Sequence, residues 1–174
     1  MRLATPALMM RSPMSAIHLE IHLATQTLTL WQQGQALLRY PVSTARNGAG
    51  EQKGSYQTPR GLHYVRAKIG ADCPLGTVFV RRRPTGEIYS PALAAQYPNR
   101  DWILTRILWL CGQEVGHNRL GNVDTFQRYI YIHGTPDTEP MGVPASHGCI
   151  RMHDLALLEV FARAPVGSHV QLVP

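Results

Sequence analysis

The chain has 174 residues, of which 44% are apolar and 16% are charged. This length suits one domain, and the apolar fraction is sufficient for a sizeable core. The low charge content excludes a coiled coil, a long charged helix and a disordered chain. The 15 glycines and 13 prolines are spread along the sequence, which is typical of a β-rich fold with many turns.

The net charge of +6 favours anionic partners, from nucleic acid to carboxylate-rich small molecules. The one basic run, Arg81–Arg83, is interpreted as a solvated strand face rather than a phosphate clamp, and no nucleic-acid-binding module is recognisable. No apolar stretch approaches the ~18 residues of a membrane-spanning helix. We therefore expect no nucleic-acid partner and no membrane partner.

The N-terminal segment and the cysteines allow a prediction of the cellular compartment. Residues 1–15 are expected to form a loose arm, and residues 16–174 a single domain. The apolar N-terminus contains Thr5 and Pro6 and meets Arg11 without a small-residue cleavage site, so we expect no export signal. An odd number of cysteines does not form a simple disulfide framework, and reduced thiols suit a cytoplasmic protein.

The first part of the chain predicts a three-stranded meander. Apolar and polar residues alternate over 17–23 and 26–31, and a third strand covers 36–42. A polar loop over 43–58 then passes through the tight turn Thr58-Pro59-Arg60-Gly61 into a strand.

The remaining elements predict a mainly β domain with one late helix. Asp154 is expected to cap a helix that ends at Pro165. The other predicted elements are, in chain order, a strand at 62–67, a hairpin of strands 77–82 and 87–90 around Pro84-Thr85-Gly86, a loop or short helix at 90–101, an apolar element at 102–110 whose pattern slightly favours a strand over a helix, an irregular connection at 112–127, a strand at 129–132 and a closing strand at 168–173.

The densest group of reactive side chains lies late in the chain. His133 directly follows the apolar strand 129–132, and Ser146-His147-Gly148-Cys149-Ile150-Arg151 comes after a proline- and glycine-containing loop. A cysteine attacks a carbonyl as its thiolate, and a neighbouring imidazole can take the proton. Gly148 lets a substrate approach the backbone and leaves amide N–H groups free for an oxyanion.

Two other interpretations of these residues stay open at this level. A buried cysteine is commonly a small apolar residue, which we prefer for Cys73 and Cys111, whereas composition and spacing alone do not decide for Cys149. A zinc site made by His133, His147, Cys149 and His153 lacks the usual paired ligand spacing, so no metal is predicted.

The sequence resembles the catalytic domain of the L,D-transpeptidase (YkuD-like) family. The resemblance rests on His133-Gly134-Thr135 followed by Ser146-His147-Gly148-Cys149-Ile150-Arg151. It extends to Thr58-Pro59-x-Gly61 and to the closing Val166–Val170 segment, and so covers about residues 16–174 as one catalytic domain. It implies a β-sandwich with one late helix and a loop or lid insertion.

The resemblance also implies an activity and roles for residues. Such enzymes cleave the bond between the third, diamino-acid residue of a peptidoglycan stem tetrapeptide and its terminal D-alanine. Cys149 would form the thioester, His133 would act as general base and acid, and the Gly134 carbonyl would orient the imidazole. The backbone of His147, Gly148 and Cys149 would form the oxyanion hole. No cofactor is expected, and carbapenem-type β-lactams would acylate the thiol.

Further residues are candidates for substrate binding. Arg151 either holds local loop structure or meets a substrate carboxylate, and Ser146 accompanies it in the motif. Arg106 and Asn118 are candidates for carboxylate recognition from a cleft wall, with an exposed strand position as the alternative for Arg106.

The fate of the acyl-enzyme separates two activities. Water gives hydrolysis of tetrapeptide to tripeptide, whereas an amine acceptor gives a cross-link. With no export signal expected, we predict a cytoplasmic L,D-carboxypeptidase of murein recycling, acting on a stem tetrapeptide or muropeptide. The alternative is a periplasmic L,D-transpeptidase, for which residues 1–16 would direct export. A non-catalytic peptide-binding module is a further alternative, disfavoured by the intact Cys149 and His133.

Overall fold

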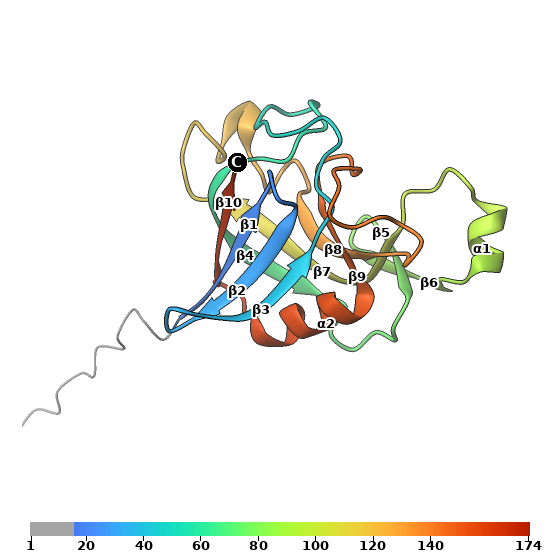
Figure 1. Cartoon of the computed structure of the whole chain (residues 1–174). Coiled ribbons are helices and arrows are strands. Elements are labelled where there is room, and N and C mark those ends of the chain that lie inside the picture. The colour runs from blue at the N-terminus through green and yellow to red at the C-terminus, as the bar shows by residue number, and fades with distance from the viewer. Residues whose placement is uncertain (1–15) are drawn as a thin grey trace, which may run out of the picture.

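A computed structural model describes residues 16–174, so the expected arm at residues 1–15 lies outside the described residues. The described chain is mostly β-strand, with a helix late in the sequence, as predicted (Figure 1). The strands are β1 (Ile17–His22), β2 (Thr27–Gln32), β3 (Gln35–Pro41), β4 (Gly61–Ile69), β5 (Thr77–Val80), β6 (Arg83–Ile88), β7 (Ile103–Gly112), β8 (Tyr131–Thr135), β9 (Ile150–His153) and β10 (His169–Val173). The helices are α1 (Pro91–Gln96), the short 3-10 helix η2 (Gly121–Val123) and α2 (Asp154–Arg163).

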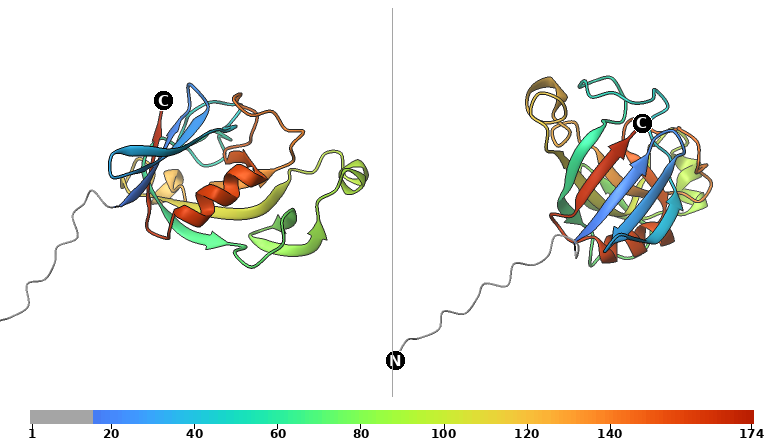
Figure 2. Two further views of the ribbon diagram at one scale, coloured as in Figure 1. Left: turned by 60° about the horizontal axis from the view of Figure 1, so that its bottom comes forward. Right: turned by 60° about the vertical axis from the view of Figure 1, so that its left-hand side comes forward.

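The strands form one continuous, curled sheet. Its order is β3-β2-β1-β10-β4-β7-β5-β6, and β8 and β9 extend from β7 as a branch. The first three strands make the predicted antiparallel meander. β10 returns to pair with β1 in parallel and with β4 antiparallel, which Figure 2 shows as a red strand between blue and green ones. The two layers expected of a sandwich are thus parts of a single sheet.

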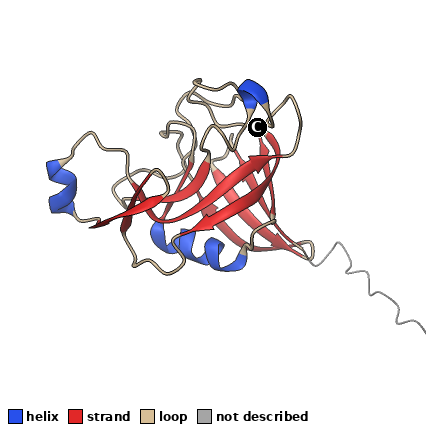
Figure 3. Cartoon of the chain, turned by 180° about the vertical axis from the view of Figure 1, so that it is seen from behind, coloured by secondary structure: helices blue, strands red, loops and turns tan. Residues whose placement is uncertain are grey.

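The main core lies between the curled sheet and α2. Leucine, isoleucine and valine side chains from the meander, β4, β7, β8, β9 and β10 meet Leu157, Val160 and Phe161 of the helix. In Figure 3, seen from behind, α2 lies along the sheet. Burying such side chains contributes about 1.5–3 kcal/mol each, so this cluster fixes β8 and β9 in place.

One predicted turn is wrong. Pro84-Thr85-Gly86 lies inside β6, and the chain reverses instead at Arg81 and Arg82. Both arginines have positive φ, 48° and 64°, the geometry of a two-residue turn that matches strand twist. Pro84 is tolerated in β6 because this strand ends the sheet and one side of it needs no partner. The error matters because it changes where Arg82 points.

The segment predicted as a loop or short helix contains α1, with Ser90 as its cap. The Ser90 hydroxyl accepts from the Leu93 amide, and Pro91 occupies the first turn, both typical of a helix start. Figure 1 shows α1 at the end of the molecule beyond β6, on a connection that returns to β7. This connection carries Asp101, which accepts a hydrogen bond from Arg151 of β9.

Candidate active site

Cys149 and His133 lie on neighbouring strands. β8 and β9 pair in parallel with Ile132 opposite Ile150, which places Cys149, just before β9, beside Tyr131. The Tyr131 amide donates to Cys149 Sγ at 3.4 Å. Side chains two residues apart share a face of a strand, so Cys149 and His133 are diagonal neighbours on one face. The strand continues to Thr135, so His133 lies inside it rather than after it.

His133 is held in one tautomer. Its side chain is 2% exposed, and its Nδ1 lies 2.7 Å from the Gly134 carbonyl oxygen. A carbonyl only accepts, so Nδ1 carries the proton and the neutral ring presents Nε2 as a base. Burial lowers the pKa of His133 below 6.5, although the Gly134 contact and Asp101 act in the opposite direction. The imidazole is therefore neutral at physiological pH.

The thiol of Cys149 is also neutral before substrate binds. Burial raises its pKa to about 12, while the Tyr131 amide and the charges of Arg151 and Arg128 act to lower it. Sγ donates to the Tyr129 carbonyl at 3.4 Å, and within residues 16–174 no hydrogen bond joins it to the imidazole. Such contacts often tighten only when substrate binds. The arrangement suits proton transfer to His133 during attack rather than a preformed ion pair.

Two backbone amides beside the thiol are free. In the described part of the chain the amides of His147 and Cys149 have no hydrogen-bond acceptor, whereas the Gly148 amide donates to Ser146 Oγ at 3.2 Å. Gly148 has a φ of 133°, which a side chain would strain. The free amides can donate to an oxyanion that develops at an attacked carbonyl.

Ser146 closes the turn that presents the thiol. It is 2% exposed, and its hydroxyl donates to the Cys149 carbonyl at 2.6 Å. Thr58 holds the same turn from the other side, since its hydroxyl donates to the Gly148 carbonyl and accepts from the Ala45 amide. Ser146 was predicted to contact the substrate, but in the structure it stabilises this turn.

Arg128, which the sequence analysis did not single out, organises the loop that carries Thr58. Its guanidinium donates to the carbonyls of Gly50, Glu51 and Gln57. Burial lowers its pKa, with Glu51 and Cys149 acting in the opposite direction. No sequence pattern marks this residue, because its acceptors are backbone atoms of a distant loop.

Arg151 holds two loops together. It is 7% exposed, and Nη2 donates to Asp101 Oδ1 at 2.8 Å while Nη1 lies 3.5 Å from Glu139 Oε2. His147 Nδ1 lies 3.2 Å from the other Asp101 oxygen. Burial raises the pKa of Asp101, but Arg151, His133 and His147 together hold it below its ordinary value. Of the two predicted roles for Arg151, the structure describes loop support.

The other two predicted carboxylate-binding residues are engaged elsewhere. Asn118 is fully buried, and its side-chain NH2 donates to the carbonyls of Arg60 and Leu62. Arg106 donates to the carbonyl of Cys73 and packs 5.7 Å above the Phe161 ring. Neither lines a cavity that contains Cys149. The sequence placed both near the cleft but gave no sign of these internal acceptors.

Two cavities lie beside Cys149 and His133. One, of about 420 Å³, is lined by Arg81, Arg82, Ile103, Tyr129, Tyr131 and Cys149. The other, of about 350 Å³, contains His147, Asp101 and Arg151 together with Arg46, Arg100 and Glu139. Arg82, Tyr129 and Tyr131 were missed as site residues, because the incorrect turn directed the arginines to solvent.

Thr105 and Asp154 form a side-chain contact next to β8, the strand that carries His133. Thr105 has a φ of 71° in a bulge of β7 opposite His133 and Gly134, an unusual conformation for a β-branched residue. Its hydroxyl donates to an Asp154 carboxylate oxygen, and the other oxygen of Asp154 is buried without a partner. A Cβ on Gly134 would lie 2.2 Å from that oxygen, so only glycine fits there.

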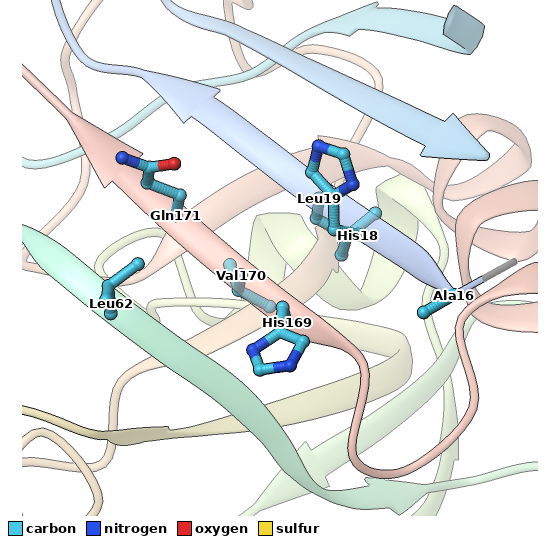
Figure 4. A pocket seen from close by; sticks show the side chains of 7 residues that line it. All are labelled: Ala16, His18, Leu19, Leu62, His169, Val170 and Gln171. Atoms are coloured by element: carbon cyan, nitrogen blue, oxygen red, sulfur yellow. The ribbon is translucent and has the colours of Figure 1, made fainter. Parts of the chain in front are cut away.

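A further depression on the surface lies apart from Cys149 and His133. Residues 16–174 contain no group of three or more metal-ligating side chains, and none of their helices has the length and apolarity to cross a membrane. This depression, of about 190 Å³, lies over β1, β4 and β10. Figure 4 shows its lining side chains, among them His18 on β1 and His169 on β10. It contains no cysteine and no arginine.

Comparison with known proteins identifies the family. Residues 16–172 match the family named YkuD, described as the L,D-transpeptidase catalytic domain. The chain is 27% identical over 128 residues to the probable L,D-transpeptidase YbiS of Escherichia coli K12, covering 68% of this chain and 40% of that protein. The chain therefore spans about two-fifths of that relative's length.

Solved structures agree in fold. L,D-transpeptidase 3 from Mycobacterium tuberculosis superposes with a TM-score of 0.57 at 16% identity, covering 91% of this chain and 61% of that one. A structure described as LD transpeptidase LdtMt1 in complex with imipenem gives 0.55 at 19% identity, with 91% and 59% coverage. With its fold, its motif and the match over residues 16–172, this chain belongs to the L,D-transpeptidase catalytic domain family.

Proposed function

We propose that this protein is an L,D-carboxypeptidase that trims peptidoglycan stem tetrapeptides to tripeptides through a thioester on Cys149. The observation that carries the proposal is the combination of the Cys149 thiol, the fixed Nδ1–H tautomer of His133 and the two free amides beside them. These supply a nucleophile, a base and an oxyanion site for attack on a carbonyl.

The reaction proceeds in two halves. Sγ attacks the carbonyl carbon of the third residue while its proton passes to His133 Nε2, and the amides of His147 and Cys149 stabilise the oxyanion. The imidazolium then protonates the leaving amine, and D-alanine departs as the thioester forms. In the second half, neutral His133 removes a proton from water, which attacks the thioester and releases the tripeptide and the thiol.

The alternative is transfer to an amine, which forms a cross-link or exchanges a D-amino acid. Both activities share the first half-reaction, and only the acceptor differs. The net charge of +6 favours acidic stem peptides in either case. We propose that the reaction takes place in the cytoplasm, and the absence of a disulfide among Cys73, Cys111 and Cys149 supports this proposal. Fractionation of cells with an antibody against the protein tests this placement.

The decisive experiment follows a soluble tetrapeptide by mass spectrometry, with and without a D-amino acid acceptor. Tripeptide and D-alanine in both samples are expected, and exchanged tetrapeptide as the main product would favour transfer instead. Cys149→Ala should lower turnover by about 10⁴-fold or more while leaving the fold intact, because no other thiol lies in the site. Substantial turnover by that variant would show that another residue is the nucleophile.

Reaction with β-lactams gives an independent readout. One solved relative is described as a complex with imipenem and another as an avibactam carbamoyl enzyme. We expect a carbapenem to add its mass to the peptide that contains Cys149, and to leave Cys149→Ala unmodified. An unmodified wild-type protein would favour the interpretation as a non-catalytic peptide-binding module.

A further inference from the structure

The geometry points to Arg82 as the residue that binds the C-terminal carboxylate of the leaving D-alanine. This inference rests on the proposed function and assigns substrate selection to the cavity lined by Arg82, Tyr129, Tyr131 and Cys149. The substrate class it names is a stem peptide that ends in a free carboxylate at the fourth residue. Longer stems and C-terminally blocked stems would lack that anion at this position.

The guanidinium of Arg82 is held rigidly. Its Cζ lies 4.7 Å from the centre of the Trp109 ring and 4.6 Å from that of Tyr129, and Nη1 donates to the Tyr131 hydroxyl at 3.0 Å. Phe126 stacks on Trp109 at 3.8 Å, which fixes that ring. Because the side chain is already ordered, a ligand would not have to fix its rotamer on binding.

The charge of Arg82 is not balanced by any carboxylate in the described chain. None of the ion pairs among residues 16–174 involves Arg82, and its one side-chain hydrogen bond goes to a neutral hydroxyl. A guanidinium has five N–H donors, so most of them are available. A half-buried cation with free donors, in a cavity that also contains the nucleophile, is suited to an anion.

The terminal carboxylate is the substrate anion that fits this place. When Sγ contacts the scissile carbonyl, the D-alanine carboxylate lies about one residue length, ~3.5 Å, further along the peptide. Other carboxylates of the stem are separated from the scissile carbon by more bonds. The aromatic residues around Arg82 do not suit a sugar, because the two faces of Trp109 are covered by Phe126 and Arg82.

The second cavity offers a weaker candidate. Arg151 is paired with Asp101 and Glu139, and Arg100 is paired with Glu87. Arg46 also lines that cavity without a carboxylate partner in the described chain, but it is exposed and stacks on no ring. Arg46 therefore serves as the competing residue in the test.

The test compares two substrates that differ only at the C-terminus, a tetrapeptide acid and the same tetrapeptide as its C-terminal amide. D-Alanine or D-alaninamide release is measured for wild type and Arg82→Gln. We expect the variant to lose about 10–100-fold in kcat/KM on the acid, as for loss of a charge-assisted contact, and to match wild type on the amide within about threefold. The kcat/KM of Arg82→Lys on the acid should lie between those of wild type and Arg82→Gln, because lysine keeps the charge but lacks the planar guanidinium.

Two other arginines compete with Arg82 and are tested in the same way: Arg81→Gln, which changes a residue lining the same cavity, and Arg46→Gln, in the other cavity. The control variant is Arg83→Gln, on β6 and outside both cavities. All three should keep the wild-type preference for the acid. Equal losses on acid and amide in Arg82→Gln, or loss of the preference in Arg81→Gln or Arg46→Gln, would overturn the assignment. Retained turnover of the amide by Arg82→Gln also shows that this variant is folded.

A measurement on wild type alone removes any dependence on the variant. N-Acetyl-D-alanine should inhibit more than tenfold better than N-acetyl-D-alaninamide, and equal inhibition would overturn the inference. D-Alanine release belongs to the half-reaction that hydrolysis and transfer share, so a preference for transfer leaves the inference standing. Absence of any D-alanine release by wild type would instead reject the proposed function, and the inference with it.

Discussion

The two cavities beside Cys149 differ in whether the positive charge of the arginine in each is paired with carboxylates. In one, Arg82 lies over aromatic rings and has no carboxylate partner in the described chain. In the other, Arg151 is buried between Asp101 and Glu139. A paired arginine stabilises the loops that it joins, whereas an unpaired and fixed arginine is available to a ligand. Within one small site, Arg151 thus holds loops together, whereas Arg82 remains available to bind a ligand.

The largest expected effect concerns the thiol that lies between them. The arginines on either side do not ionise it, since burial raises its pKa to about 12. Iodoacetamide at pH 8 should therefore alkylate Cys149 roughly 30–100-fold more slowly than a free cysteine, after allowing for the greater nucleophilicity of a high-pKa thiolate. Mass spectrometry of the Cys149 peptide, with N-acetylcysteine in the same tube, measures this ratio.

A faster reaction than that of the free thiol, with a plateau near neutral pH, would contradict this prediction. It would show that a thiolate–imidazolium pair with His133 exists before substrate binds. The Cys149→Ala variant gives the background from the other two cysteines.

Removing the paired arginine should damage stability more than removing the unpaired one. Arg151→Leu leaves the Asp101 and Glu139 carboxylates without their cation, and we expect a loss of about 2–3 kcal/mol in the free energy of unfolding. Arg82→Leu leaves no carboxylate without a partner. We expect it to lower the free energy of unfolding by about 1 kcal/mol, because the contacts with the rings are lost. Urea unfolding measures both, and equal losses would remove the distinction between the two cavities.

Asp101→Asn should have a smaller destabilising effect, and its size depends on pH. The folded-state pKa of Asp101 is lowered, so its ion pair stabilises the protein above the unfolded value of about 3.9, and that contribution disappears as the pH falls through the folded pKa. With 47% of the side chain exposed, solvent screening limits the loss at pH 7 to about 0.5–1 kcal/mol. Unfolding curves of wild type and variant should converge below about pH 4, and a constant gap would contradict the ion-pair origin.

The smallest effects are expected from the two cysteines outside the site. Cys73 packs against the cluster of Phe79, Ile107 and Tyr131, and the thiol of Cys111 contacts the Gly112 carbonyl at 3.5 Å. Cys73→Ser and Cys111→Ser should each change kcat/KM by less than about twofold. A loss of rate in a folded variant would instead require a role for that thiol in catalysis.

The sequence was most informative where the pattern is local. The alternation in β1 and β2 and the existence of the late helix are each determined by neighbouring residues. Two local details were wrong: Thr58-Pro59-Arg60 leads into β4 without a tight turn, and Asp154 is the first residue of α2 while His153 occupies the cap position. The pairing of His133 with Gly134 is local in the same sense, since the contact joins adjacent residues. Such features need no knowledge of the tertiary fold.

The sequence was least informative where a long-range contact overrides a local preference. Pro84-Thr85-Gly86 has better turn composition than Arg81-Arg82, yet pairing of Val80 with Arg83 places the turn at the arginines. Thr105 adopts a positive φ that its composition disfavours, and its hydroxyl contacts Gly76 and Asp154, both far away in the sequence. Arg106 and Asn118 each donate to at least one carbonyl that is distant in the sequence, Cys73 for Arg106 and Arg60 for Asn118, and no spacing rule identifies these acceptors.

The parallel pairing of β1 with β10 has a consequence for how this protein is made. The meander β1–β3 joins the rest of the described sheet through β10, which is the last strand in the chain. A ribosome must therefore release almost the whole sequence before the meander can dock. Until then the apolar inner faces of β1 and β2 remain without the core residues that cover them in the folded protein. Folding is expected to be slow, because the pairing of β1 with β10 spans the full length of the domain.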